Sequence, residues 1–115
     1  MTPLQSLTRK LLEFRDARDW RQFHNPKDMA LSLTLEAAEL LEIFQWQEGD
    51  AIAETAAARK ADIGDELADI LSWLLLMSHD LEIDLVAALE AKLVTNAQKY
   101  PVDKSRGTSR KYTEL

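Results

Sequence analysis

One segment constrains the fold more than any other, because residues 67–77 are apolar on every face of the helix that they would form. A helix of this kind must be buried somewhere, and this one is too short to cross a bilayer and contains Asp69. In a chain of 115 residues, a single layer of four helices can hardly surround it. We therefore expect a homo-oligomer, a dimer or a tetramer, whose subunits share this segment. The alternative is that the other helices of one chain wrap it.

The composition predicts an all-α protein. Only three Gly and three Pro occur, Ala, Leu, Glu, Lys and Arg dominate, and no alternation typical of strands is present. Helical spacing and capping signals at Asn25-Pro26 and Asp84 divide the chain. We predict helices over residues 4–21, 26–47, 51–81 (with an undecided break at 59–62) and 85–100. This gives a four- to five-helix bundle, a helical domain over 1–101, and a polar, basic, extended or disordered tail over 102–115.

Several functional classes are excluded at this point. The chain has no cysteine, which removes disulfides, thiolate catalysis and zinc–sulfur sites. Its first residues have no apolar core of a signal peptide, so we expect a soluble cytoplasmic protein without membrane contact. The net charge of −6 argues against binding to nucleic acid. It does not argue against a nucleotide, whose phosphates a divalent cation can bridge.

Two pairs of acids lie on the predicted helices at a spacing of three: Glu36 with Glu39, and Glu66 with Asp69. At this spacing each pair shares one helix face, with Cβ atoms about 5–6 Å apart. If the pairs faced each other, they would offer four hard oxygen donors, which suit Mg²⁺. The competing interpretation of either pair alone is a solvated helix face, since acids are seldom buried.

The surroundings of these acids favour a metal site. Residues seven apart lie nearly above one another on a helix, so Glu36 continues a line formed by Met29 and Ile43. Asp69 is flanked by apolar residues, and we expect it to be partly buried. A buried carboxylate needs a cation, a partner or a proton, and no Lys or Arg occurs between residues 62 and 81. A metal ion is the simplest answer.

The remaining acids and the other kinds of site have weaker support. Exposed or capping roles suffice for Glu42, Glu48, Asp62 and Asp65, although Asp62 and Asp65 could assist the metal ligands indirectly. A di-iron bundle requires Glu-x-x-His motifs, and the chain has none. A glycine-rich P-loop and the local signatures of Ser/His/Asp hydrolases are also absent.

The motif Glu36-x-x-Glu39 followed by Glu66-x-x-Asp69 resembles the metal motif of the all-α, MazG-like nucleotide pyrophosphohydrolases, and the similarity covers nearly the whole chain. Further segments, in the same order, resemble the dCTP pyrophosphatase branch of that family. They are Arg18-Asp19-Trp20-Arg21-Gln22-Phe23-His24, Leu41-Glu42-Ile43-Phe44-Gln45-Trp46, Lys92 with Asn96, Tyr100-Pro101, and Ser109-Arg110-Lys111-Tyr112-Thr113-Glu114-Leu115.

The resemblance implies the fold of that family and its reaction, in which a nucleoside triphosphate is cut at the α-phosphorus into monophosphate and pyrophosphate. The four motif acids would hold Mg²⁺, which lowers the pKa of an attacking water, and Glu39 would accept the proton of that water. The basic tail 104–111 would form either a flap over the phosphates or a solvated tail that aids solubility, and the resemblance favours the flap. The substrate-binding residues would be Trp20, Trp46 and Asn96 at the base, Lys92 and Tyr100 at the phosphates, and His24.

Two positions depart from the family pattern. Leu35 stands where the wider superfamily often has an extra Glu, which the dCTP branch also lacks. Leu11 stands where some members of that branch have a histidine near the base. The expected substrate is dCTP or a modified cytosine nucleotide, with dUTP or an oxidised nucleotide as alternatives. A non-enzymatic helical assembly protein that pairs through residues 67–77 is the rival class, but it leaves the aligned acids unexplained.

Overall fold

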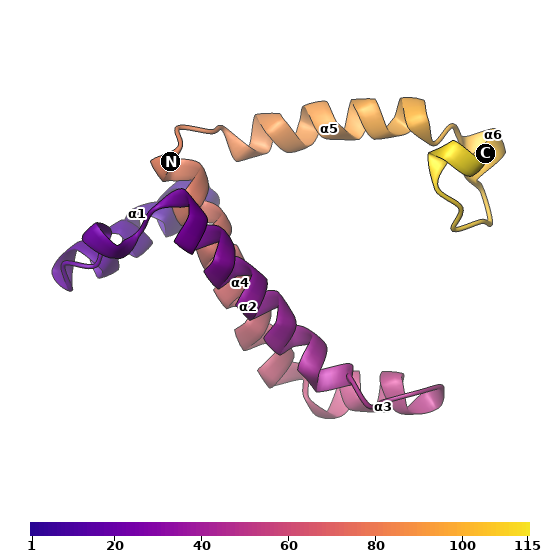
Figure 1. Ribbon diagram of the computed structural model, residues 1–115, viewed down its shortest axis with the longest axis horizontal. Coiled ribbons are helices and arrows are strands. Elements are labelled where there is room, and N and C mark those ends of the chain that lie inside the picture. Colours follow the sequence, from indigo (N-terminus) through magenta and orange to yellow (C-terminus); the bar gives the residue numbers. More distant parts are fainter. The chain divides into compact units, whose positions relative to one another are not determined.

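The computed structural model describes all 115 residues and contains helices and turns but no strand, as the composition predicted (Figure 1). The chain forms two compact units, Met1–Glu82 and Ile83–Leu115, and each is described by itself. The elements are α1 (Pro3–Ala17), a 3₁₀ turn (Arg21–Phe23), α2 (Pro26–Phe44), α3 (Asp50–Ala58), α4 (Lys60–Asp80), α5 (Leu85–Lys99), α6 (Val102–Ser105) and a second 3₁₀ turn (Tyr112–Glu114).

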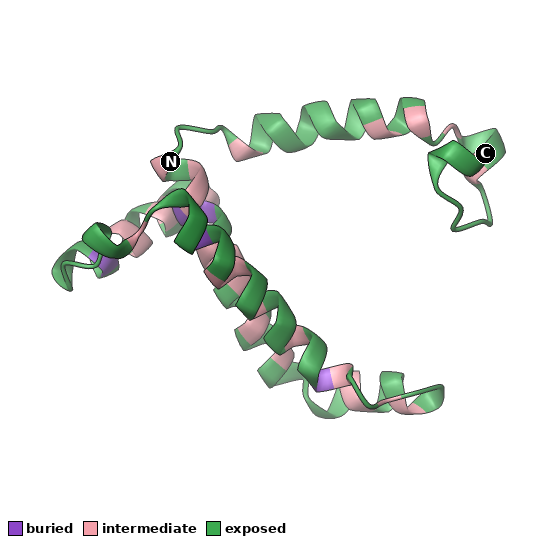
Figure 2. Cartoon of the chain, in the orientation of Figure 1, coloured by how far each residue is buried: buried purple, intermediate pink, exposed green.

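The first unit is organised around the two longest helices, α2 and α4, which lie side by side (Figure 1). Helix α1 packs against α4, and α3 contacts both α2 and α4. The buried apolar side chains are Met29 and Ile43 from α2, and Leu75 and Leu76 from α4. Figure 2 shows how small this core is, because most of the ribbon is exposed. The packing of α2 on α4 therefore sets the positions of the side chains that these two helices direct toward each other.

Three helices begin at side chains that accept a hydrogen bond from the backbone, which satisfies one of the free amides of the first turn. The pairs are Thr2 with the amide of Gln5, Asn25 with the amide of Asp28, and Asp84 with the amide of Ala87. The predicted starts at Asn25-Pro26 and Asp84 are thus confirmed.

The predicted helix ends needed correction. The first helix ends at Ala17 rather than residue 21, because Asp19 adopts a left-handed conformation with φ of 54°, which Asp tolerates better than most residues. The second ends at Phe44, three residues early. The third begins at Asp50, one residue early, and Gly49 precedes it at a φ of 56°. The undecided break falls at Arg59, which separates α3 from α4.

The tail after Pro101 is not extended, which corrects the expectation for residues 102–115. It contains α6 and the second 3₁₀ turn. The ring of Tyr112 lies edge-on to that of Tyr100, with centroids 6.0 Å apart, and the Lys99 ammonium lies 4.8 Å from the Tyr112 centroid. Aromatic packing and a cation–π contact therefore order a segment whose local composition is polar.

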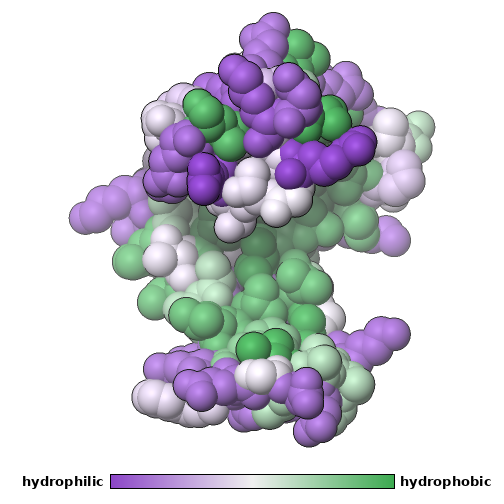
Figure 3. Space-filling model, turned by 90° about the vertical axis from the view of Figure 1, so that its right-hand side faces the viewer, coloured by the Kyte–Doolittle hydropathy of each residue, from purple (hydrophilic) through white to green (hydrophobic).

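Each unit leaves large apolar side chains exposed. In Figure 3, apolar residues (green) are visible at the surface in the middle of the view, the level at which α2 and α4 lie in Figure 1. Within the apolar segment 67–77, Leu75 and Leu76 are buried, but Leu67 is 51 % exposed, so the rest of the first unit covers this segment only in part. On α5, the exposed Val86, Leu89 and Leu93 recur at helical spacing. No helix has the length and apolar content needed to cross a membrane.

Candidate metal centre

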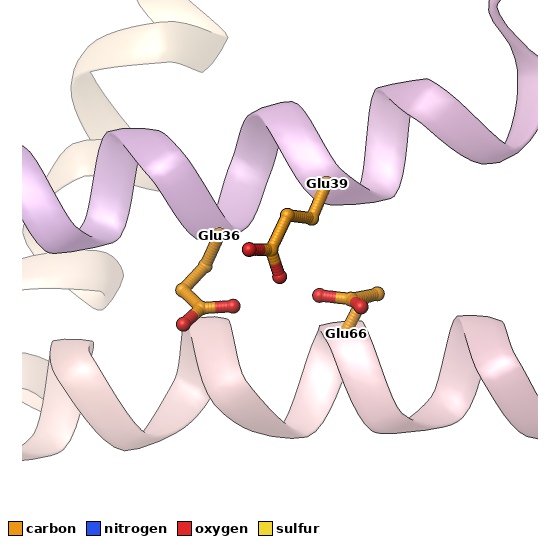
Figure 4. Close-up of side chains that lie close together, drawn as sticks. All are labelled: Glu36, Glu39 and Glu66. Carbon is orange, nitrogen blue, oxygen red and sulfur yellow. The ribbon is translucent and has the colours of Figure 1, made fainter.

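Three of the four motif carboxylates converge between α2 and α4 (Figure 4). Glu36 and Glu39 come from one face of α2, and Glu66 faces them from α4. One carboxylate oxygen from each of the three lies within 4.8 Å of the others. The sequence spacing placed the first two together, and the pairing of the two helices brings in the third.

No positively charged side chain neutralises the carboxylate cluster. Oε2 of Glu36 and Oε2 of Glu66 are buried and have no hydrogen-bond partner, and a polar atom that lacks both water and a partner destabilises the fold. No Lys or Arg forms an ion pair with either side chain. Arg59 lines a cavity beside the cluster, which is described below, but its guanidinium pairs with Asp62 at 3.0 Å. A bound cation would satisfy both orphaned oxygens.

The electrostatics of the cluster point the same way. Burial raises the pKa of Glu36 from its ordinary 4.5 to about 7, helped by a hydrogen bond shared with Glu39. The negative charges of Glu39, Asp69 and Glu66 act in the same direction. Burial also raises the pKa of Glu66, with contributions from Glu39, Asp69 and Asp65. Because the acids repel one another, a positive ion placed among them would stabilise all of the ionised forms.

The donor set fits a hard divalent cation. All three groups offer carboxylate oxygen, with no nitrogen or sulfur ligand nearby, and such a set suits Mg²⁺, Ca²⁺ or Mn²⁺ better than Zn²⁺. A three-carboxylate site leaves positions for water or phosphate oxygens, which is the usual arrangement around protein-bound Mg²⁺.

Asp69 is placed differently from the other three. It lies one turn after Glu66 on α4 and is exposed, so the expectation of partial burial was wrong. The flanking residues in the sequence point to other faces of a helix and say little about the environment of Asp69 itself. Its charge nevertheless raises the pKa of both Glu36 and Glu66, so it belongs to the electrostatic neighbourhood of the cluster.

A cavity of about 480 Å³ adjoins the carboxylates within the first unit. It is open, and its walls are mostly charged. Its lining residues are Glu39, Glu42, Ile43, Arg59, Asp62, Asp65 and Glu66. Sequence reasoning gave Glu42 an exposed role and did not consider Arg59 as a site residue. The signal was their spacing, since Glu42 follows Glu39 by one turn and Arg59 precedes Glu66 by two.

The three aromatic residues named from the sequence lie at the ends of helices in the first unit. Trp20 follows α1, is partly exposed, and lies edge-on to Phe14 with centroids 5.8 Å apart. Trp46 follows α2 and is 83 % exposed, so it is not a core residue. His24 precedes α2, is half-buried, and its ring lies edge-on to that of Trp73.

The other three named residues belong to the second unit. Lys92 and Asn96 lie one turn apart on α5, and Tyr100 directly follows that helix. Lys92 is exposed and Asn96 is half-buried, while Tyr100 contacts Tyr112. They lie near one another along the C-terminal half of α5, as their spacing predicts.

Comparisons with known proteins agree on one family. The MazG-like family model matches residues 31–115. The chain is 39 % identical over 114 residues to dCTP pyrophosphatase 1 of Mus musculus and 38 % identical over 114 residues to that of Homo sapiens. In both cases the match covers 97 % of this chain and 67 % of the relative. The crystal structure of a pyrophosphatase from Archaeoglobus fulgidus superimposes with a TM-score of 0.85 at 40 % identity, covering 88 % of this chain and 94 % of that one.

Proposed function

The chain belongs to the MazG-like family and is a nucleotide pyrophosphohydrolase, and from this premise we propose that it hydrolyses dCTP, or a modified cytosine nucleotide, to the monophosphate and diphosphate with Mg²⁺. The observation that supports the metal most directly is the cluster of Glu36, Glu39 and Glu66, with its two orphaned buried oxygens. The mammalian relatives support the choice of dCTP.

We assign the metal to the converging Glu36, Glu39 and Glu66, and we propose Asp69, one turn after Glu66 on α4, as the fourth residue that would hold it. When bound, Mg²⁺ supplies charge for the triphosphate oxygens and lowers the pKa of a coordinated water. Glu39 is the only member of the cluster that is exposed and also lines the cavity. It therefore accepts the proton as water attacks the α-phosphorus and pyrophosphate leaves.

We assign substrate contacts to the residues outside the cluster. The exposed rings of Trp20 and Trp46 stack on the base, and His24 and Asn96 donate or accept hydrogen bonds at the nucleoside. Lys92 and Tyr100 bind phosphate oxygens, and the basic residues between 104 and 111 close over them. The ordered turns of that tail support such a role, because a prefolded segment loses less entropy on binding.

Incubation with a panel of nucleoside triphosphates and Mg²⁺ tests the function directly. We expect dCTP to have the highest kcat/KM, with dCMP and pyrophosphate formed in equal amounts. Release of inorganic phosphate would contradict attack at the α-phosphorus. A preference for dUTP or an oxidised nucleotide would support the proposed reaction but contradict dCTP as the substrate. No hydrolysis of any triphosphate would favour the helical assembly protein.

The exposed apolar surface supports a homo-oligomer, which we propose to be a dimer or a tetramer. Leu67 and its neighbours on α4 remain incompletely covered by the first unit, and an exposed apolar surface of this kind marks an interface. We expect light scattering at micromolar concentration to give a multiple of the 13.1 kDa chain mass. Leu67→Glu should lower the mass toward that of the monomer, because it places an unpaired charge in the interface. A wild-type monomer would overturn the proposal, and Lys10→Glu, at an exposed polar position of α1, serves as the control.

The assignment of Trp46 can be tested by truncation. Trp46→Ala should raise the KM for dCTP about tenfold, since base–aromatic stacking contributes about 1–3 kcal/mol. Because the side chain is 83 % exposed, the melting temperature and the response to Mg²⁺ should stay close to wild type. Trp46→Phe retains a stacking surface and should restore most of the affinity. A loss of the Mg²⁺ response in Trp46→Ala would contradict the assignment.

A further inference from the structure

A buried ion pair joins α1 to α4 at the end of the helix pair remote from the carboxylates. Nη1 and Nη2 of Arg15 donate to Oδ2 and Oδ1 of Asp80 at 2.8 and 3.0 Å, and the two side chains are only 5 % and 8 % exposed. Asp80 lies 14 residues after Glu66 on α4 (80 − 66), or about 21 Å along the helix axis. The pair is therefore separate from the metal centre.

The ion pair is connected to His24. The same Nη1 of Arg15 lies 3.4 Å from Nδ1 of His24. On the other side, the imidazole ring lies edge-on to Trp73 of α4, with centroids 5.1 Å apart and planes at 61°. Arg21 donates to the backbone carbonyl of His24 at 2.6 Å. Arg15 and Trp73 thus contact the ring itself, and Arg21 holds the backbone that carries it.

The chemistry of arginine determines the state of that ring. A guanidinium can only donate hydrogen bonds and does not lose its proton in proteins. The atom facing it, Nδ1 of His24, must therefore be the acceptor, which is possible only in a neutral imidazole whose proton is on Nε2. The hydrogen bonds within the chain include none to Nε2.

The charged groups around His24 agree with a neutral ring. Burial lowers the pKa of His24, and the positive charge of Arg15 lowers it further. Asp80 on α4 acts in the opposite direction, and Arg21 in the 3₁₀ turn again lowers the pKa. The balance is toward the neutral form at physiological pH.

We infer that the Arg15–Asp80 pair positions His24 as a neutral imidazole protonated at Nε2, so that Nε2 is a fixed hydrogen-bond donor for an uncharged acceptor on the nucleotide base. Asp80 holds the guanidinium of Arg15 in place, and this guanidinium donates a hydrogen bond to Nδ1 of His24. A donor without net charge suits a carbonyl oxygen or ring nitrogen, such as O2 or N3 of cytosine, better than a phosphate. The part that concerns the base rests on the proposed function, whereas the state of the ring does not.

Nitrogen-15 NMR of the full chain tests the state of the ring without any activity measurement. His79→Gln leaves His24 as the only histidine and thereby assigns its signals. At pH 7 we expect an unprotonated Nδ1 and a protonated Nε2 in the two-bond proton–nitrogen correlation pattern. A ring protonated at Nδ1, or an imidazolium at this pH, would overturn the inference.

A matched pair of substitutions on α1 tests whether Arg15 is the cause. Arg15→Lys keeps the positive charge but loses the fork, so the His24 Nδ1 resonance should shift toward the value of a ring that exchanges between tautomers. Arg9→Lys changes an exposed arginine on the same helix and should leave the resonance in place. If Arg15→Lys shifts nothing, the positioning role is wrong. If it does not fold, the wild-type spectrum still decides the state of the ring.

Titration with dCMP, without metal, tests the contact with the base. Binding should move the His24 Nε2 resonance while the ring keeps its protonation state, and Arg15→Lys should raise the KM for dCTP several-fold with kcat nearly unchanged. An unmoved Nε2 signal at saturating dCMP would overturn the contact. If dCTP is not a substrate at all, the kinetic experiment fails, but the ring state measured by NMR stands independently.

Discussion

Glu39→Gln should reduce turnover of dCTP at least about a hundredfold while the helical content stays unchanged. Groups that merely support metal ligands change activity by about 10–100-fold when mutated, and Glu39 is assigned both to the metal and to the proton of the attacking water. The amide retains the shape of the side chain but offers neither negative charge nor a base. Because Glu39 is exposed, the substitution leaves no cavity and should not unfold the chain.

The measurement is kcat at saturating dCTP and Mg²⁺, together with a circular dichroism spectrum. Glu13→Gln is the matched control, since this exposed acid on α1 pairs only with Arg9 and should retain wild-type turnover. Near wild-type kcat in Glu39→Gln would remove Glu39 from the mechanism. Activity that returned at much higher Mg²⁺ would leave it as a ligand but not as the proton acceptor.

Without metal, the folded chain should lose stability as pH rises from about 4.5 through about 7, and Mg²⁺ should restore it. The folded-state pKa of Glu36 is raised from 4.5 to about 7, so the folded chain holds this proton more tightly than the unfolded chain does. The stability that the protonated Glu36 contributes is therefore fully present below the unfolded pKa of 4.5, and it is lost as the pH rises through the folded pKa of about 7. Mg²⁺ replaces the proton and should stabilise by about 2.7 kcal/mol at a hundredfold excess over Kd.

Melting curves in EDTA and in excess Mg²⁺, between pH 5 and 8, provide the test. The gain from Mg²⁺ should be larger at pH 8 than at pH 6, because protons compete for Glu36 at the lower pH, and it should reach about 10 °C. Glu36→Gln should flatten the pH dependence in EDTA and reduce the gain, whereas Glu13→Gln should behave as wild type. If wild type and Glu36→Gln show the same profiles, the carboxylate cluster does not bind the ion.

The helical architecture and the central pair of the site could be predicted because both depend on local periodicity. Asn25 and Asp84 announce helix starts by their own side-chain chemistry, and a spacing of three places Glu36 and Glu39 on one face whatever the tertiary structure. The approach of Glu66 required the further assumption that the two acidic helices face each other. The packing of α2 on α4 confirms this assumption.

The features that sequence reasoning missed depend on contacts between distant residues or on single backbone conformations. Arg15 and Asp80 are 65 residues apart, and no local pattern pairs them. The early end of α1 depends on the left-handed backbone of Asp19, which an Asp permits but does not require. The exposure of Asp69 depends on which face of α4 the neighbouring helices cover, and its apolar neighbours in the sequence do not report this.

The position of the tryptophans relative to α2 has an evolutionary consequence. The carboxylates lie within long helices that also hold the first unit together, whereas Trp20 and Trp46 lie in the short connections just beyond the two ends of α2. Connections tolerate substitution better than packed helices do. On the assignment proposed above, a lineage could therefore acquire a new base preference by changing these connections, without rebuilding the hydrolytic apparatus. Directed evolution toward other damaged or modified nucleotides should begin with residues 19–24 and 45–48.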